Sequence, residues 1–155
     1  SDNNEYIWIK GNLSRSNQIM AITRMAESYE NMTSQNPVAV CLDLVLQFRG
    51  TNRDVEGLLE NGMGVEQILE NSLTQARVLD LDGCPLSTVL YYVNQDIPVI
   101  CLLNNGEAML VIGFNELNTV LMDPGTGTVY KYGMNDSAEL FENNGNHFIT
   151  YITEG

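Results

Sequence analysis

The chain has 155 residues, of which 44% are apolar, and 20 acidic residues stand against 7 basic ones, for a net charge of −13. This length suits one domain with a proper core, and the scarcity of Lys and Arg excludes a basic patch for nucleic acid or an anionic membrane. No segment approaches the roughly 18 consecutive apolar residues of a membrane span, so we expect no span in this chain.

The first third of the sequence predicts an arm and two helices. Residues 6–9 predict a short strand or an ordered arm, and residues 15–33 place apolar side chains at three- and four-residue steps, as an amphipathic helix does. Residues 37–48, PVAVCLDLVLQF, contain only two polar side chains and predict a helix buried almost all round. Asn36 suits the N-cap of this helix, and Pro37 suits its first position.

The rest of the chain predicts short helices and a sheet. Helices are expected at 53–61, 64–73, 86–94 and 134–142, and strands at 76–81, 98–103, 107–114, 118–123, 128–132 and 147–152. Helices first and a mostly antiparallel sheet afterwards make an α+β fold. We expect residues 1–34 to form an arm and helix, and residues 35–155 the main domain, in one structural unit.

Neither the cysteines nor the acidic segment at residues 80–83 predicts a metal site, and we expect no cofactor. Cys41, Cys84 and Cys101 are odd in number and widely spaced, which fits neither a disulfide framework nor a zinc site. The segment DLDG, from Asp80, has the opening of a calcium loop, but Tyr91 stands at the twelfth position, where a Glu is required. We interpret it as a strand end followed by a turn.

Two acidic residues lie at the ends of predicted buried strands. Glu107 precedes the run AMLVI, which is apolar on both faces and therefore typical of a central strand. A carboxylate at the start of such a strand needs water, a partner or a function. Asp123 ends the strand VLMD before the turn PGTG. Turn chemistry explains Pro124 and the glycines but not Asp123.

Three segments in this order carry a family resemblance. PVICLL (98–103), GEAMLVIGFN (106–115) and VLMDP (120–124) follow the buried helix. Together they resemble the bacteriocin-processing cysteine peptidases and their relatives, the peptidase C39-like family of the papain-like superfamily, over about residues 35–152. The resemblance implies a papain-like α+β fold in which the buried N-terminal helix packs on a mostly antiparallel sheet.

The resemblance also implies four chemical groups, of which one is present. In the family a Gln supports the oxyanion hole, a Cys opens the buried helix, a His opens a central strand and an Asp orients that His. Here Pro37 occupies the position of the Cys and Glu107 that of the His, while Asp123 matches the Asp. Met122 replaces the Asn that precedes the family's Asp, and Gln35 is too close to the helix to be the family's Gln.

This comparison favours a degenerate peptidase, which is to say a non-catalytic peptidase-like domain that binds a peptide or protein, or a module of a larger bacterial protein. Such domains hold the transport substrate in some bacterial exporters, so a cell-surface or secreted location is favoured. Asn36, Glu107 and Asp123 are the candidates for the binding cleft, with no metal expected. If Glu107 and Asp123 face each other, the repulsion must be relieved by a shared proton, a cation, or separation into water.

Two alternatives stay open. The first is a cysteine peptidase or other hydrolase with a displaced catalytic site, which would use Cys41 or an unrecognised acid pair. We expect Cys41 to be a core residue, and His147, the other possible stand-in, to be a surface or capping residue. The second is a purely structural domain, whose cleft would be filled by its own chain, for example by residues 1–14.

Overall fold

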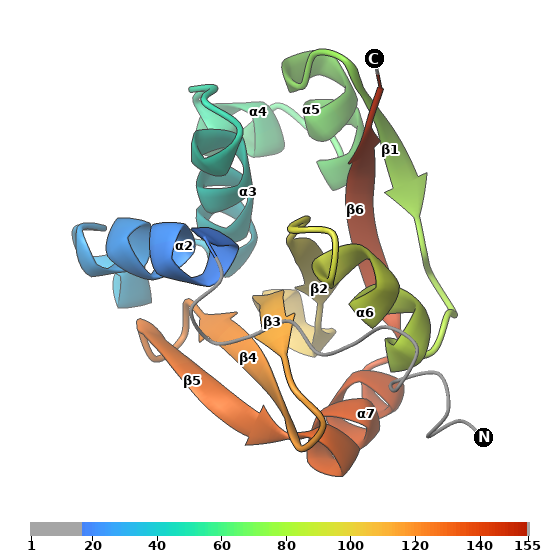
Figure 1. The fold of residues 1–155 in the computed structure, drawn as a ribbon. Coiled ribbons are helices and arrows are strands. Elements are labelled where there is room, and N and C mark those ends of the chain that lie inside the picture. Colours follow the sequence, from blue (N-terminus) through green and yellow to red (C-terminus); the bar gives the residue numbers. More distant parts are fainter. Residues whose placement is uncertain (1–16, 155) are drawn as a thin grey trace.

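The computed structural model describes residues 17–154, which form an α+β fold of three layers (Figure 1). The helices are α2 (Asn17–Glu27), α3 (Pro37–Phe48), α4 (Val55–Glu60), α5 (Val65–Ser72), α6 (Leu86–Val93) and α7 (Met134–Asn143), with short 3-10 turns η1 (Met32–Ser34) and η2 (Asn104–Gly106). The strands are β1 (Ala76–Asp80), β2 (Val99–Leu102), β3 (Ala108–Phe114), β4 (Asn118–Asp123), β5 (Thr128–Gly133) and β6 (His147–Thr153).

The six strands make one sheet in the order β1-β6-β2-β3-β4-β5, and every neighbouring pair is antiparallel. The predicted α+β class and antiparallel sheet are therefore confirmed. All seven residues of β3 are buried, which agrees with its central place in the sheet. The hairpin predicted between β3 and β4 is also present, and Asn115 accepts hydrogen bonds from the backbone N–H groups of Leu117 and Asn118 at 2.9 and 2.8 Å.

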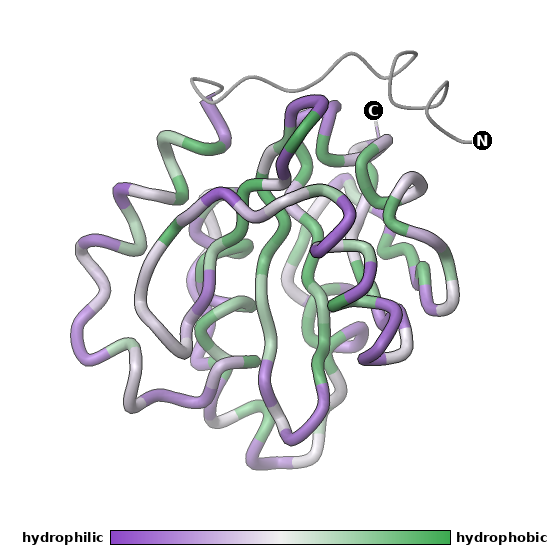
Figure 2. The backbone as a smooth tube through the Cα atoms, turned by 90° about the horizontal axis from the view of Figure 1, so that it is seen from below, coloured by the Kyte–Doolittle hydropathy of each residue, from purple (hydrophilic) through white to green (hydrophobic). Residues whose placement is uncertain are grey.

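Each face of the sheet supports its own apolar core, because successive strand residues point to opposite faces. One core joins α2, α3, α4 and α5 to strand residues that include Ala108, Leu110 and Ile112. The other joins α6 and α7 to residues that include Met109 and Val111. Figure 2 shows the resulting pattern, with apolar stretches concentrated in the central strands and hydrophilic residues at the turns.

Helix α3 is the buried helix that the sequence predicts. Seven of its twelve residues are buried, and it begins at Pro37 behind the N-cap Asn36, as expected. At its other end Gly50 has φ +78°, and Thr51 N–H donates to the Leu46 carbonyl at 2.8 Å, which is the Schellman arrangement of a helix C-terminus. The guanidinium carbon of Arg49 lies 5.3 Å from the centroid of the Tyr151 ring, so the end of α3 is held against β6.

Helix α2 ends earlier than the sequence indicates. The expected helix reached residue 33, but α2 ends at Glu27 and η1 takes up the last residues. The reason is tertiary: Tyr29 leaves the helix and donates a hydrogen bond of 2.5 Å to the carboxylate of Asp43 in α3. Gln18, fully buried in α2, donates to the Ile112 carbonyl at 2.6 Å, where the register of β3 shifts at a bulge.

These contacts connect α2 to the sheet and to α3. The boundary we place between residues 34 and 35 stays a prediction, and the arm of residues 1–16, with its expected strand at 6–9, lies outside the described residues. None of the helices between residues 17 and 154 has the length and apolar composition needed to span a lipid bilayer.

The contact between Tyr29 and Asp43 generates a test of pH dependence. Burial raises the pKa of Asp43, and the nearby Asp54 adds to this, while the hydrogen bond from Tyr29 opposes it. A carboxyl group whose pKa is higher in the folded state stabilises that state at low pH, and this contribution is lost as the pH rises through the raised pKa. We therefore expect Asp43→Asn to gain stability relative to the parent protein as pH increases from 4 to 7, with a melting temperature about 1–3 °C higher near pH 7.

Thermal melts across that pH range measure the effect. Glu139→Gln, which removes an exposed carboxylate elsewhere, is the matched control and should show no such trend. Tyr29→Phe should lower the stability near neutral pH by about 1–2 kcal/mol, because it leaves a half-buried carboxylate without its donor. A constant difference between Asp43→Asn and the parent protein at every pH would contradict the assignment.

Candidate functional site

The N-terminus of α3, where the resemblance places a nucleophile, is closed by its own capping residue. The Asn36 Oδ1 accepts hydrogen bonds from the backbone N–H groups of Val38 and Ala39 at 2.9 and 3.4 Å. Val40 N–H already donates to the Asn36 carbonyl at 3.0 Å, and Pro37 has no N–H group. The first turn of α3 therefore has no free backbone donor with which to stabilise a thiolate or an oxyanion.

Glu107 lies just before β3 rather than within it, which corrects the expected strand 107–114 by one residue. The turn η2 precedes Glu107, and the Glu107 carbonyl accepts a hydrogen bond of 2.8 Å from Leu103 N–H. The Glu107 side chain is exposed, and its carboxylate forms no hydrogen bond with any residue between 17 and 154. The buried strand therefore begins at Ala108, and the carboxylate stays at the boundary with water.

Asp123, at the end of β4, organises the following turn. Its Oδ1 accepts from Gly125 N–H at 2.8 Å, and its Oδ2 accepts from the Tyr130 hydroxyl at 3.5 Å. Its carbonyl accepts from Gly127 N–H at 2.8 Å. Burial and the neighbouring Asp123 carboxylate raise the pKa of Tyr130, which therefore keeps its proton and donates. The side chain of Asp123 is thus accounted for by the turn and by Tyr130, a partner that the sequence analysis did not find.

The two carboxylates flank one glycine. A Cβ atom added at Gly125 would lie 3.2 Å from Asp123 Oδ1 and 3.6 Å from Glu107 Oε1. The pairing of β3 with β4 brings these side chains to the same place. The segment that leads into α3 reaches the same turn, because Thr33 Cγ2 would lie 3.3 Å from a Cβ at Gly127. Glu107 and Asp123 thus lie beside the turn Asp123–Gly127, which Thr33 of η1 also reaches.

Cys41 is a core residue. Its side chain has no exposed surface, and burial raises the pKa of its thiol well above the ordinary value, with smaller contributions from Cys101 and Asp123. A nucleophilic cysteine needs a lowered pKa and access to the substrate, and Cys41 has neither. Cys101 is equally buried, while Cys84 is partly accessible.

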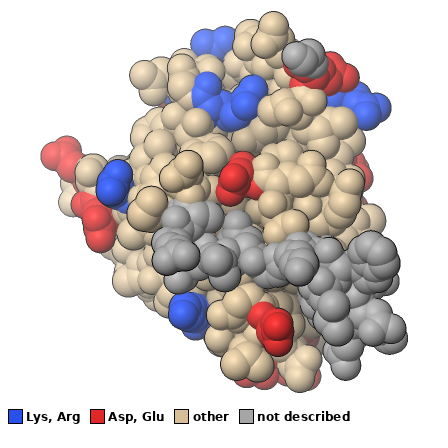
Figure 3. All heavy atoms as spheres, in the orientation of Figure 1, with Lys and Arg blue, Asp and Glu red and all other residues tan. Residues whose placement is uncertain are grey.

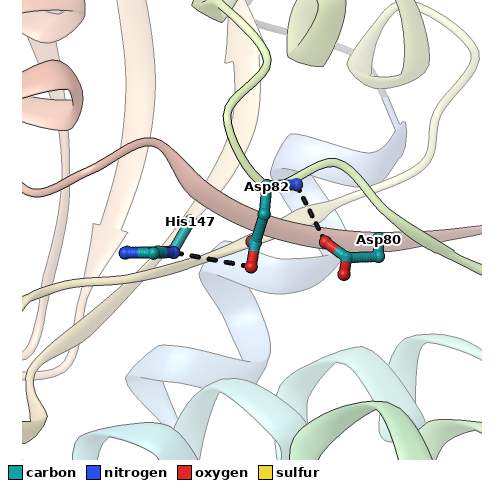
Figure 4. A network of polar contacts seen from close by, with 3 residues as sticks. All are labelled: Asp80, Asp82 and His147. Carbon is teal, nitrogen blue, oxygen red and sulfur yellow. Dashed lines mark hydrogen bonds and ion pairs between the residues drawn. The ribbon is translucent and has the colours of Figure 1, made fainter.

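His147 belongs to a different corner of the molecule, at the start of β6 (Figure 4). Its Nδ1 lies 3.5 Å from Asp82 Oδ2, an ion pair when the imidazole is protonated, and Asp82 N–H donates to Asp80 Oδ1 at 2.8 Å. Strand β2 separates β6 from β3, and the ladder pairs His147 with Leu102. Between residues 17 and 154, no group of three or more His, Cys, Asp or Glu side chains is arranged to hold a metal ion.

A small pocket lies beside the turn, between α2 and the start of β5. Its volume is about 280 Å³, and the lining residues are Thr23, Ala26, Glu27, Gly127, Thr128 and Val129. The lining residues of α2 and those of β5 are far apart in the sequence, so the sequence alone gave no signal for the pocket. The pocket adjoins the turn through Gly127, which has φ +72°.

Comparison with known proteins supports the fold. No protein-family model matches the sequence, and no curated protein matches it either. Among solved structures, the chain is similar to a crystal structure from Bacillus anthracis described as a "putative C39-like peptidase". The TM-score is 0.61 and the sequence identity 14%, over 79% of this chain and 90% of that chain. The chain therefore has a peptidase-like fold of the C39-like type.

The burial of Cys41 predicts its reactivity. We expect iodoacetamide at neutral pH to label Cys84 first, and Cys41 and Cys101 only when the protein unfolds, because the two buried thiols are protonated and inaccessible. Peptide mapping by mass spectrometry follows all three sites, with Cys84 as the internal control. Rapid and selective labelling of Cys41 in the folded protein, lost on denaturation, would revive a displaced catalytic site.

The geometry around Gly125 predicts that the two carboxylates contribute unequally to stability. Asp123→Ala removes acceptors for Gly125 N–H and the Tyr130 hydroxyl and should cost about 1–2 kcal/mol of unfolding free energy. Glu107→Ala changes an exposed side chain and should stay within about 0.5 kcal/mol. Urea unfolding at pH 7, repeated with millimolar calcium, measures both. A large effect of Glu107→Ala, or a calcium-dependent one, would show that the two carboxylates are coupled.

Proposed function

We propose that this chain is a non-catalytic peptidase-like domain that binds a peptide or protein segment beside the turn Asp123–Gly127. The observation that carries the proposal is the start of α3. Pro37 stands at the nucleophile position of the resemblance, and Asn36 caps the free N–H groups behind it. A thiol peptidase needs a nucleophile and donors for the oxyanion at this place.

The second missing group has the same consequence. In the family a His takes the proton of the thiol and then stabilises the thiolate as an imidazolium. Glu107 is a carboxylate, and a negative charge raises the pKa of a nearby thiol instead of lowering it. Asp123, whose role in the family is to orient the His, here receives hydrogen bonds from Gly125 and Tyr130. The remaining member of the catalytic set thus serves the turn.

Binding is supported by what surrounds the turn. Gly125, between the two carboxylates, is exposed and has no side chain. The pocket between α2 and β5 lies next to Gly127. A bound peptide can use a pocket of this kind for selectivity. We place the protein among bacterial peptide-binding modules at the cell surface or in secreted form, with no nucleic acid as partner.

The alternatives make different predictions. A hydrolase that uses Cys41 requires substrate to reach a side chain with no exposed surface. A purely structural domain requires the surface beside Gly125 to be covered by other parts of the chain, such as residues 1–14, which lie outside the described residues. Binding and labelling measurements on the full chain separate the three.

The proposal predicts binding without cleavage. A mixture of capped random pentapeptides, added to the ¹⁵N-labelled chain, should move the amide signals of Glu107, Gly125 and Gly127. Mass spectrometry of the same samples should find no cleaved peptide. Gly125→Val, which places side-chain atoms between the two carboxylates, should weaken the effect. Cleavage by the unmodified chain, or unmoved signals throughout, would contradict the proposal.

A variant that restores two of the family's catalytic groups tests the geometry of the proposed site. The double substitution Pro37→Cys with Glu107→His restores two of the family's groups beside Asp123. The introduced thiol should react with iodoacetamide on the order of tenfold faster at pH 7 than in the partner variant Pro37→Cys with Glu107→Ala, because an imidazolium lowers a thiol pKa. Equal rates would mean that positions 37 and 107 are not juxtaposed as the resemblance implies.

A further inference from the structure

The pocket between α2 and β5 has a definite chemical character. Ala26, which is buried, and Val129, which packs against the core, supply its apolar surface. Thr23 and Thr128 supply hydroxyl groups. Glu27, exposed at the end of α2, is the only titratable residue that residues 17–154 contribute to the lining. Among the described residues, the pocket therefore combines an apolar wall with one exposed carboxylate, that of Glu27.

Its size fits one side chain. A volume of about 280 Å³ lies just below the range of roughly 300–1,000 Å³ that is typical of pockets for drug-sized ligands. Long basic side chains place an apolar stem against protein surface and keep the charged head near water, as this arrangement requires. An acidic side chain would meet the Glu27 carboxylate, and an apolar one would leave that carboxylate unpaired.

The Glu27 carboxylate is available for a ligand. Within residues 17–154 it takes part in no ion pair or hydrogen bond, although Arg24 lies one turn earlier on α2. Glu107 and Asp123 add negative charge, because they flank the turn that forms one wall. Lys131, further along β5, is the one basic residue of that strand. Figure 3 shows both acidic and basic side chains scattered over this view of the molecule.

Within residues 17–154, the site also lies at an edge of the sheet. Strand β5 is the last strand of the sheet, and among the described residues it pairs only with β4. The pocket is formed at its first residues, Thr128 and Val129, directly after the turn. A peptide that lies along the turn can therefore direct one side chain between β5 and α2.

We propose that the pocket between α2 and β5 takes a Lys or Arg side chain of the bound peptide, with Glu27 as the pairing carboxylate. This inference rests on the proposed function and adds the chemical class of the ligand. Charge complementarity carries it: the chain has a net charge of −13, and the pocket has one carboxylate from the described residues, which has no ion pair or hydrogen bond among them. The carboxylates beside Gly125 extend the same preference along the peptide.

The test uses the full ¹⁵N-labelled chain and three capped peptides. Acetyl-Ala-Thr-Lys-Thr-Ala-amide should move the amide signals of Thr23, Glu27, Thr128 and Val129. The peptide with norleucine in place of Lys keeps the stem without the charge and should bind about two- to fivefold more weakly, since one exposed ion pair contributes this much. The peptide with Glu should not bind the pocket.

Substitutions in the pocket, with one control outside it, separate the contribution of the Glu27 charge from that of the pocket's shape. Glu27→Gln should weaken the Lys peptide about two- to fivefold and remove its advantage over norleucine. Glu30→Gln, which changes a nearby exposed carboxylate outside the pocket, should have no effect. Thr23→Met fills the pocket and should abolish the shifts at Thr128 and Val129. Equal binding of the Lys and norleucine peptides, or unchanged binding to Thr23→Met, overturns the inference.

The outcomes distinguish failure of this inference from failure of the proposed function on which it rests. If random peptides move Glu107 and Gly125 while the Lys peptide leaves α2 and β5 unmoved, the inference fails and the proposed function stands. If no peptide moves any signal, both fail.

Discussion

The burial of β3 on both faces is the constraint on which the rest of the structure depends. A strand between two cores can carry no unpaired polar side chain along its length, so its chemistry is confined to its ends. Glu107 therefore stands one residue before the strand, in water. Where the register of β3 shifts, the Ile112 carbonyl is supplied with a donor by Gln18, which ties α2 to the sheet. The position of α2, and hence of the pocket beside it, follows from this contact.

The start of α3 shows how a few residues change what a fold can do. In a peptidase-like fold the N-terminus of this helix is the natural place for a thiolate, because free N–H groups and the helix dipole favour negative charge there. Here a proline removes one donor, and the Asn36 side chain accepts hydrogen bonds from two others. The capping that stabilises the helix is thus the same feature on which the proposed lack of catalysis rests. The buried face of α3 needs no change, which is why the fold persists.

The acidic residues around the turn Asp123–Gly127 have different roles. Asp123 is held by Gly125 and Tyr130, so it shapes the backbone. Glu107 and Glu27 are exposed and without partners among the described residues. In the proposed function these are the carboxylates that pair with a basic peptide, which would approach along the sheet edge at β5.

The sequence by itself determined the elements whose cause is local. The all-round apolar run and its N-cap predicted α3 to the residue, and Asn115 with its neighbours predicted the hairpin, because caps and turns act over a few positions. Only the tertiary structure decided the end of α2, which depends on Tyr29 meeting Asp43, and the pairing of Asp123 with Tyr130. It also decided the pocket, because Ala26 and Val129 become neighbours only when α2 packs across the sheet. Periodicity describes which face of an element is buried, but the partner on that face is chosen by packing between segments that are distant in the chain.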